Sequence, residues 1–271
     1  HREKRNLSSL FVPPAEGGGM EINMKITDHI YLVGSGKWGF GITHPLDCNI
    51  YMIDTGEGCI LIDSGVGLDT WKMDEIIKSH GFELSDIKAV ILSHYHGDHA
   101  CGAARIAEAT GCKVYAPAPE AKAIETGDET ATSVGLGKGG LYPSDFEYPK
   151  CPNVAGLEDG DSVTIGNVTI KVFLVPGHSL CDMVMYTEID GKKCLFTADS
   201  VFVCGQVLIQ SLHDVSIYPY ACKMKELAEL EVDALFPGHG VFCLEDGGVH
   251  VKTCADKFAT GLIPPQLYYF A

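Results

Sequence analysis

The chain has 271 residues, a formal net charge of −16 and a hydrophobic fraction of 46%. This length suits one large α/β domain or two small ones, and the hydrophobic fraction is ample for a buried core. The negative charge disfavours binding to nucleic acid or to an anionic membrane surface, because both attract lysine and arginine. No apolar run approaches the roughly twenty residues that a membrane-spanning helix needs. We therefore expect neither nucleic acid nor a membrane as a partner.

The cysteines indicate the compartment in which the protein works. There are eleven of them, an odd number, and no Cys-x-x-Cys pair occurs. Scattered cysteines inside strand-like runs, such as Cys59 and Cys194, are typical of reduced, buried thiols rather than of a disulfide framework. The segment His1–Arg5 is not followed by the apolar core of a signal peptide. We expect a cytoplasmic protein.

The first half of the chain alternates between strand and helix patterns. Turn residues bound the apolar strand-like runs, and one segment has apolar residues at helical spacing. The expected strands are 30–33, 49–54, 59–63, 89–92 and 113–116, and the expected helices are 71–80 and 119–125.

Two loops of this half carry candidate functional residues. Gly34–Pro45 is rich in glycine and contains Trp38, Phe40 and His44. It is either a hairpin loop or an aromatic flap over a cleft, and both interpretations stay open. Residues 126–153 form a longer segment without periodicity, and such a segment in a compact domain is usually functional or disordered.

The second half is rich in strands and ends in helices. The expected strands are 162–165, 168–175, 183–186 and 193–197, and the expected helices are 223–230 and 249–259. The apolar and aromatic tail 262–271 either packs on the core or forms a contact in a homodimer. Periodicity alone supports a mixed α/β fold.

A dense set of metal-capable residues follows the strand 89–92. His94, His96, Asp98 and His99 lie within six residues, at the junction with a helix-compatible segment. Neutral imidazole and carboxylate are ligands that a zinc-class cation selects. Any one histidine alone would more often be a surface or core residue, but the set favours a metal site.

Three further candidates lie at the ends of later strand-like runs. His178 follows the run 168–175, Asp199 ends the run 193–197, and His239 follows the short apolar run 234–236. Each residue alone is more often structural. Four different strand-like segments are thus followed by a metal-capable residue, and core packing does not explain this repetition.

The order and spacing of these residues resemble the metallo-β-lactamase superfamily, from about Ile26 to about Phe242. The sequences around His178 and Asp199 resemble glyoxalase II and lactonase-like hydrolases more than antibiotic-degrading lactamases. The resemblance implies a four-layer αββα sandwich formed by one domain over residues 20–271. Residues 1–19 are then an N-terminal extension or linker, and 126–153 is a lid-like insertion.

The resemblance also assigns roles to single residues. It implies that His94, His96 and His178 hold one metal ion, and that Asp199 bridges to a second. The ligands of this second ion are Asp98, His99 and His239. Asp63, at the end of the strand 59–63, is expected to hydrogen-bond a ligand histidine from behind. The metal is expected to be zinc, with iron or manganese as alternatives that accept the same ligands.

The function implied is a dinuclear hydrolase of an ester, lactone or thioester. A hydroxide that bridges the two ions would attack the carbonyl carbon, with Asp98 as the proton shuttle. One alternative is a mononuclear iron oxygenase that resembles persulfide dioxygenases and uses His94, His178 and Asp199. The other is a metal-binding module without enzymatic activity. Phosphodiester cleavage is disfavoured by the acidic charge.

The expected walls of the cleft suggest a small-molecule substrate. They are the Trp38–His44 loop, the insertion 126–153 and the stretch with Tyr218 and Tyr220. Basic residues are few, and a phosphodiester would normally meet more of them. The candidates are Lys37 and Lys138, with Lys252 and Lys257 near the last helix for a glutathione-like anion. We therefore expect a small, weakly charged ester or lactone rather than a glutathione thioester.

Overall fold

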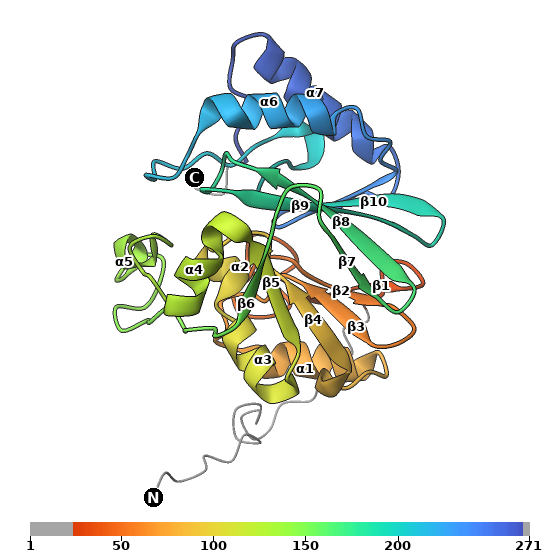
Figure 1. Ribbon diagram of the computed structural model, residues 1–271, viewed down its shortest axis with the longest axis vertical. Coiled ribbons are helices and arrows are strands. Elements are labelled where there is room, and N and C mark those ends of the chain that lie inside the picture. Colours follow the sequence, from red (N-terminus) through yellow and green to blue (C-terminus); the bar gives the residue numbers. More distant parts are fainter. Residues whose placement is uncertain (1–23, 268–271) are drawn as a thin grey trace, which may run out of the picture.

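The computed structural model describes residues 24–267, so the expected N-terminal extension 1–19 lies outside the described residues. Two β-sheets pack face to face, and helices cover the outer face of each (Figure 1). This arrangement confirms the expected four-layer αββα sandwich. No helix within residues 24–267 is long and apolar enough to cross a membrane.

The first sheet has the strand order β1-β2-β3-β4-β5-β6. Its first three strands are antiparallel, and β3 to β6 run parallel. The strands are β1 (Ile30–Gly34), β2 (Ile50–Asp54), β3 (Cys59–Ile62), β4 (Ile87–Ile91), β5 (Lys113–Pro117) and β6 (Val154–Leu157). Its helices are α1 (Thr70–Ser79), α2 (Gly97–Ala100), α3 (Ala103–Thr110), α4 (Ala118–Thr126) and α5 (Val134–Gly137).

The second sheet has the strand order β11-β10-β9-β8-β7, and only the pair β10–β11 is parallel. The strands are β7 (Ser162–Ile165), β8 (Val168–Val175), β9 (Asp182–Ile189), β10 (Lys192–Ala198) and β11 (Ala234–Pro237). The helices α6 (Ile217–Leu227) and α7 (Gly247–Ala259) cover its outer face (Figure 1).

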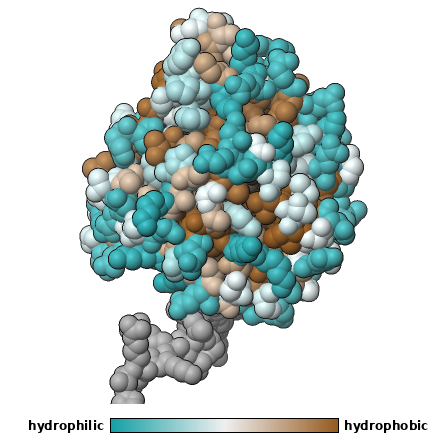
Figure 2. All heavy atoms as spheres, in the orientation of Figure 1, coloured by the Kyte–Doolittle hydropathy of each residue, from teal (hydrophilic) through white to brown (hydrophobic). Residues whose placement is uncertain are grey.

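Alternation along the strands builds the layers. In β1, Ile30 and Leu32 face the core between the two sheets, whereas Tyr31 and Val33 face the helices of the first sheet. Successive side chains of a strand point to opposite faces, so an apolar run such as β1 is buried on both sides. Each aliphatic side chain buried in this way contributes about 1.5–3 kcal/mol to stability. Figure 2 shows hydrophilic side chains over much of one face of the molecule, with apolar groups between them.

Two elements differ from the sequence-based expectation. Strand β6 was not expected, because Val154–Leu157 contains a glycine and has no alternating pattern; it pairs in parallel with β5. Helix α6 begins at Ile217 rather than near residue 223. Pro219 lies in its first turn, where the missing N–H costs nothing because that position has no intrahelical partner.

The topology brings several loops to one edge of the sandwich. The carboxyl ends of β4, β10 and β11 carry six of the seven candidate ligands, and the seventh, His178, follows β8. The end of β3, which is parallel to β4, carries Asp63. Tyr51 of β2 donates its hydroxyl hydrogen to the carbonyl oxygen of Pro237 at 2.8 Å. The N–H of Met183 donates to the carbonyl oxygen of Ser93 at 2.7 Å. These bonds join the two sheets next to the candidate site.

Candidate metal centre

Three imidazole rings meet in a first cluster at this edge. His94 Nε2 lies 3.0 Å from His96 Nδ1, which lies 3.0 Å from His178 Nε2. His94 and His96 come from the loop between β4 and α2, and His178 comes from the loop between β8 and β9. The three side chains are buried, and their nitrogens are close enough to share one ion.

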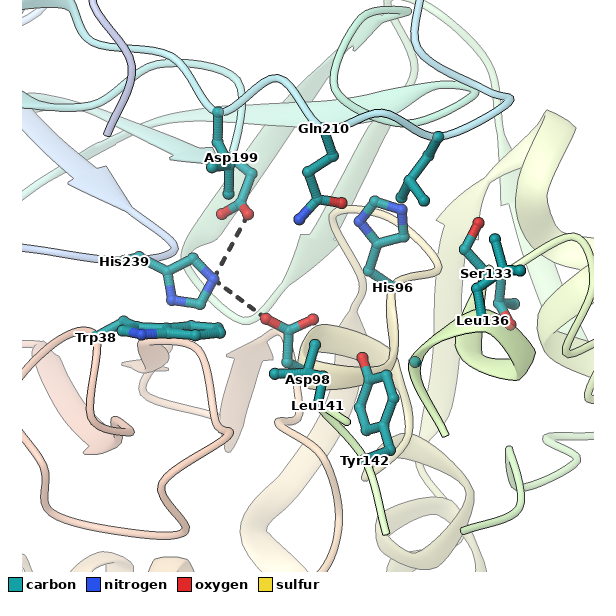
Figure 3. Close-up of a pocket in the computed structure, with 14 residues that line it drawn as sticks. Trp38, His96, Asp98, Ser133, Leu136, Leu141, Tyr142, Asp199, Gln210 and His239 are labelled. Atoms are coloured by element: carbon teal, nitrogen blue, oxygen red, sulfur yellow. Dashed lines mark ion pairs between the residues drawn. The ribbon is translucent and has the colours of Figure 1, made fainter. Parts of the chain in front are cut away.

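A second cluster adjoins the first. His239 Nε2 lies 3.3 Å from His99 Nε2 and 3.2 Å from Asp98 Oδ2. Asp98 and His99 lie in the short helix α2, whereas His239 follows β11. Figure 3 shows His239 and Asp98 turned toward each other, with Trp38 beside the imidazole ring.

Asp199 lies between the two clusters. Its Oδ2 is 3.5 Å from His178 Nε2 of the first cluster and 3.5 Å from His239 Nε2 of the second. Its Oδ1 is buried and has no hydrogen-bond partner among the described residues. The structure therefore brings together all seven residues that the sequence nominated as metal ligands.

The hydrogen bonds behind the rings leave unprotonated nitrogens in the first cluster. His178 Nδ1 donates to the carbonyl oxygen of Leu208 at 2.6 Å, which in the neutral ring leaves the lone pair on Nε2. Ser93 Oγ donates to Asp63, so it accepts from His94 Nδ1 at 2.9 Å, and His94 Nε2 also carries a lone pair. Lone pairs about 3 Å apart repel unless a cation lies between them. This donor set fits a zinc-class ion.

Burial and neighbouring charges tune the same groups. Burial, helped by the other histidines, holds the pKa of His94 well below its usual value, which keeps the ring neutral and able to bind metal. Burial alone would lower the pKa of His99, but negative groups around it, including Asp199, raise that pKa well above its usual value. Burial alone would raise the pKa of Asp98, but the neighbouring His99 and His239 outweigh this effect and lower that pKa.

Carboxylates lie next to the ring nitrogens of the ligand histidines that point away from the two clusters. Asp63 Oδ2 lies 2.9 Å from His99 Nδ1, which is the arrangement expected from the sequence. Asp214 Oδ2 lies 3.6 Å from His96 Nε2. Sequence reasoning missed Asp214 and the Leu208 carbonyl, because both lie in an irregular loop without a motif.

The backbone around the site is tightly constrained. A Cβ atom on Gly238 would lie 2.6 Å from Asp199 Oδ1 and 2.7 Å from His99 Cε1, so only glycine fits there. Asp63 and Ala198 have positive φ angles of 61° and 43°, at the ends of β3 and β10. Non-glycine residues in this region are strained and persist only where the surroundings hold them, as at functional sites.

A cavity of about 220 Å³ opens over the two clusters. Its floor contains His96, Asp98, Asp199 and His239, and Figure 3 shows Trp38 and Leu136 on opposite sides of it. The remaining wall residues come from the insertion 126–153 and from the loop after β10. They are Thr132, Ser133, Gly137, Leu141, Tyr142, Leu208, Gln210 and Leu212.

The five residues expected to contact substrate are not all at this cavity. Trp38 lines it, with its ring 5.7 Å from that of His239. Phe40 packs near Phe242 at 5.5 Å, and His44 lies in a turn, where its Nδ1 accepts from the N–H of Leu46. Neither lines the cavity.

The two tyrosines also lie elsewhere, which corrects the expectation that they form a wall. Both belong to α6, since this helix begins at Ile217. Tyr220 points into the core between α6 and the second sheet, where its ring fills the space next to Gly177. Tyr218 points outward and is 81% exposed.

A model of the metallo-beta-lactamase superfamily matches residues 44–239 of the chain. This match covers most of the sequence and includes every candidate ligand. The chain belongs to the metallo-β-lactamase superfamily.

Solved structures with the same fold include subclass B3 metallo-β-lactamases. The enzyme of Bradyrhizobium japonicum has a TM-score of 0.66 and 22% identity, over 88% of this chain and 92% of that one. A B3 enzyme with an active-site glutamic acid has a TM-score of 0.67 and 19% identity, over 87% and 88%. At these identities the likeness shows the shared fold.

Curated relatives include fungal proteins. The lactamase-like protein vrtG of Penicillium aethiopicum is 24% identical over 74% of this chain and 53% of its own length. The atrochrysone carboxyl ACP thioesterase of Aspergillus fumigatus is 24% identical over 71% of this chain and 50% of its own length. The chain therefore spans about half the length of these relatives.

Proposed function

We propose that the chain is a dinuclear metal-dependent hydrolase that attacks the carbonyl carbon of an ester, lactone or thioester. The observation that carries this proposal is the pair of ligand clusters joined by Asp199 at the floor of a cavity. Two divalent ions in such a site would acidify a water molecule and polarise the carbonyl oxygen. Zinc suits the donor set best, and iron or manganese would accept the same ligands.

Asp98 is the residue that we assign to proton transfer. Its side chain is 14% exposed and lines the cavity, whereas Asp199 is 3% exposed. The lowered pKa of Asp98, caused by its neighbouring histidines against the effect of burial, keeps the carboxylate charged near neutral pH. A charged carboxylate in this place can accept a proton from the attacking water and deliver it to the leaving group.

The cavity walls favour a substrate with a weakly charged, apolar body. The described wall residues include Trp38, several leucines and Tyr142, but no lysine or arginine. Lys138 of the insertion is instead paired with Glu129 at 2.6 Å. A substrate with a carboxylate or phosphate at or near the reacting group would normally meet a cation. Glutathione thioesters, β-lactams and phosphodiesters all carry such a group.

Two hydroxyl groups in the wall suggest how such a substrate would be oriented. Thr132 is 2% exposed and Ser133 is 8% exposed, and both line the cavity. Neither hydroxyl oxygen has a hydrogen-bond partner within the described residues. Buried polar groups are normally paired, so these hydroxyls are suited to bond a neutral oxygen of the acyl group. One curated relative is itself named a thioesterase, which supports a thioester within the proposed substrate class.

The free thiols support a reducing compartment, and we propose the cytoplasm. All eleven cysteines are free, and most are buried. Burial raises the pKa of Cys194 to about 12, so this thiol stays protonated and unreactive. Titration of the native and the unfolded protein with a thiol reagent tests this. The exposed Cys204 and Cys222 should react in the native protein, and all eleven should react after unfolding without a reductant.

Steady-state kinetics on the metal-loaded protein tests the proposed reaction. The panel contains an apolar acyl thioester, an aryl ester, a lactone, an S-lactoylglutathione-type thioester, a β-lactam and a phosphodiester. We expect the first three to show the highest kcat/KM. Fastest turnover of the phosphodiester would contradict carbonyl hydrolysis. Oxygen uptake by the iron-loaded protein with a persulfide substrate would instead support the mononuclear oxygenase, which needs only His94, His178 and Asp199.

A further inference from the structure

The loop that follows β10 contacts two of the three rings in the first cluster. Its Leu208 carbonyl oxygen accepts a hydrogen bond from His178 Nδ1 at 2.6 Å. Its Asp214 Oδ2 lies 3.6 Å from His96 Nε2. The second cluster depends on a different residue, Asp63, through His99. The loop 206–214 therefore supports the first cluster selectively.

Asp214 is built into a buried polar contact. It is 8% exposed, and its Oδ2 also accepts the hydroxyl hydrogen of Tyr95 at 2.7 Å. His96 directs Nδ1 at the first cluster. Its buried Nε2 has no hydrogen-bond partner within the described residues, and the Asp214 carboxylate at 3.6 Å is the group placed to favour a proton on that nitrogen.

The same loop forms one wall of the cavity. Leu208, Gln210 and Leu212 line it, and Figure 3 shows Gln210 between Asp199 and His96. The neighbouring residues Val207 and Ile209 face the other way: Val207 is fully buried in the core under α6 and α7, and Ile209 packs against this core. This alternation is that of an extended segment. The loop 206–214 thus contacts the ligand histidines and also lines the cavity.

The C-terminal segment fixes the position of this loop. The N–H of Val207 donates to the carbonyl oxygen of Pro265 at 2.9 Å, and the N–H of Leu267 donates to the carbonyl oxygen of Val207 at 2.8 Å. The side-chain Oε1 of Gln266 accepts from the N–H of Ile209 at 2.8 Å. These bonds flank Leu208, whose carbonyl oxygen must reach His178.

We propose that the loop 206–214, held by residues 265–267, is a positioning element for the metal ion of the first cluster, with Asp214 and Gln266 as its positioning residues. Asp214 orients His96, and Gln266 holds the Leu208 carbonyl against His178. The inference rests on the proposed dinuclear function. It adds that the C-terminal segment, which contributes no ligand, sets the affinity of one of the two ions.

The test is stepwise metal binding by the metal-free chain, measured by chelator competition with Zn²⁺ and by the absorption of Co²⁺. The reference variants His94→Ala and His239→Ala each remove one ligand, from the first and the second cluster respectively. They show which of the two measured affinities belongs to which cluster. In Asp214→Asn, which keeps the size of the side chain, we expect the first-cluster affinity to fall by about 10–100-fold, the usual scale for lost outer contacts. The second-cluster affinity should stay at the wild-type value.

Three further variants make the outcome decisive. Gln266→Ala and Tyr95→Phe should weaken the same ion, and they replace Asp214→Asn if that variant does not fold. Ser211→Ala is the matched control in the same loop, because Ser211 is exposed and does not line the cavity; it should leave both metal affinities unchanged.

The outcomes separate this inference from the proposed function. Wild-type protein that binds fewer than two ions contradicts the dinuclear function itself. The positioning role alone is overturned by a different result. In that case the wild-type protein binds two ions, and the folded variants Asp214→Asn and Gln266→Ala either keep both metal affinities or weaken both equally. Circular dichroism and thermal unfolding establish that each variant is folded.

Discussion

Asp63 and Ser93 are joined by two hydrogen bonds: Asp63 Oδ1 accepts from the N–H of Ser93 at 2.7 Å, and Oδ2 accepts from its hydroxyl at 2.9 Å. The same carboxylate contacts His99 Nδ1. One buried side chain at the end of β3 thus fixes the start of the histidine motif and orients a ligand six residues later.

Replacing this carboxylate should destabilise the fold as well as the second cluster. Asp63→Ala leaves the buried Ser93 N–H without a partner, and hydrogen bonds to charged groups are worth about 1.5–3 kcal/mol each. We expect a loss of roughly 2–3 kcal/mol in the free energy of unfolding, measured by urea denaturation of the metal-free chain. Asp63→Asn, which keeps an acceptor, should lose less. Equal stability of Asp63→Ala and wild type would contradict the role.

Metal content is the most direct prediction. The seven ligand candidates form two clusters, so elemental analysis of metal-loaded protein should give two ions per chain. Removal of the ions by a chelator should lower the melting temperature, because ions that bind only the folded state stabilise it. Acidification should release the ions as the ligand histidines become protonated. A single ion per chain would argue against Asp199 as a bridge.

Asp98→Asn should separate catalysis from folding. Asparagine keeps the size of the side chain but does not accept a proton near neutral pH. We expect kcat to fall by about 10²-fold or more, with the fold and at least one metal ion retained. Elemental analysis and circular dichroism on the same preparation supply the control. Turnover at the wild-type rate would remove Asp98 from the mechanism.

Leu136 should contribute to substrate affinity without contributing to stability. It lines the cavity and is 79% exposed, so Leu136→Ala should change the free energy of unfolding by no more than about 0.5 kcal/mol. We expect KM for an apolar acyl substrate to rise and kcat to stay similar. Leu262→Ala is the matched control, since Leu262 is 58% exposed and lies outside the cavity. A parallel rise in KM for both variants would indicate a nonspecific effect.

An ion pair between the two sheets should make stability depend on pH. His29 Nδ1, before β1, lies 2.5 Å from Asp190 Oδ1 in the turn between β9 and β10. The hydrogen bond to Asp190 is the main cause that raises the pKa of His29. A group whose pKa is higher in the folded state than in the unfolded state stabilises the fold. For histidine this contribution is complete below the unfolded-state pKa of about 6.5, and it is lost as the pH rises through the folded-state pKa.

The matching variant is His29→Gln. It should destabilise the protein by about 1 kcal/mol or less at pH 5.5, because the His29 side chain is half exposed, and by a smaller amount at pH 9. Urea denaturation at the two pH values measures the difference. A larger loss at pH 9 than at pH 5.5 would reverse the sign and contradict the assignment.

The sequence by itself nominated the seven candidate ligands, and the family resemblance that they carry predicted the layers of the fold, since periodicity alone supported only a mixed α/β fold. Each ligand follows a run whose apolar pattern predicts a strand, as His94 follows 89–92 and His239 follows β11. Such signals are local: a strand pattern and the residue after it are read within a few positions. For the same reason the helix predicted over 71–80 is present as α1, with Met73, Ile76 and Ile77 buried on one side.

Only the tertiary structure decided which groups contact the ligand histidines and which residues form the cavity wall. Asp214 and the Leu208 carbonyl lie in an irregular segment, where no periodicity marks which group will meet a histidine 30 residues or more away. The same holds for Gln266, which bonds the N–H of Ile209. Tyr220 was misplaced for a related reason, since a helix that starts a few residues earlier turns this ring from the cavity into the core. Contacts between segments distant in the chain depend on the packing of the two sheets, and a local sequence pattern carries no information about that packing.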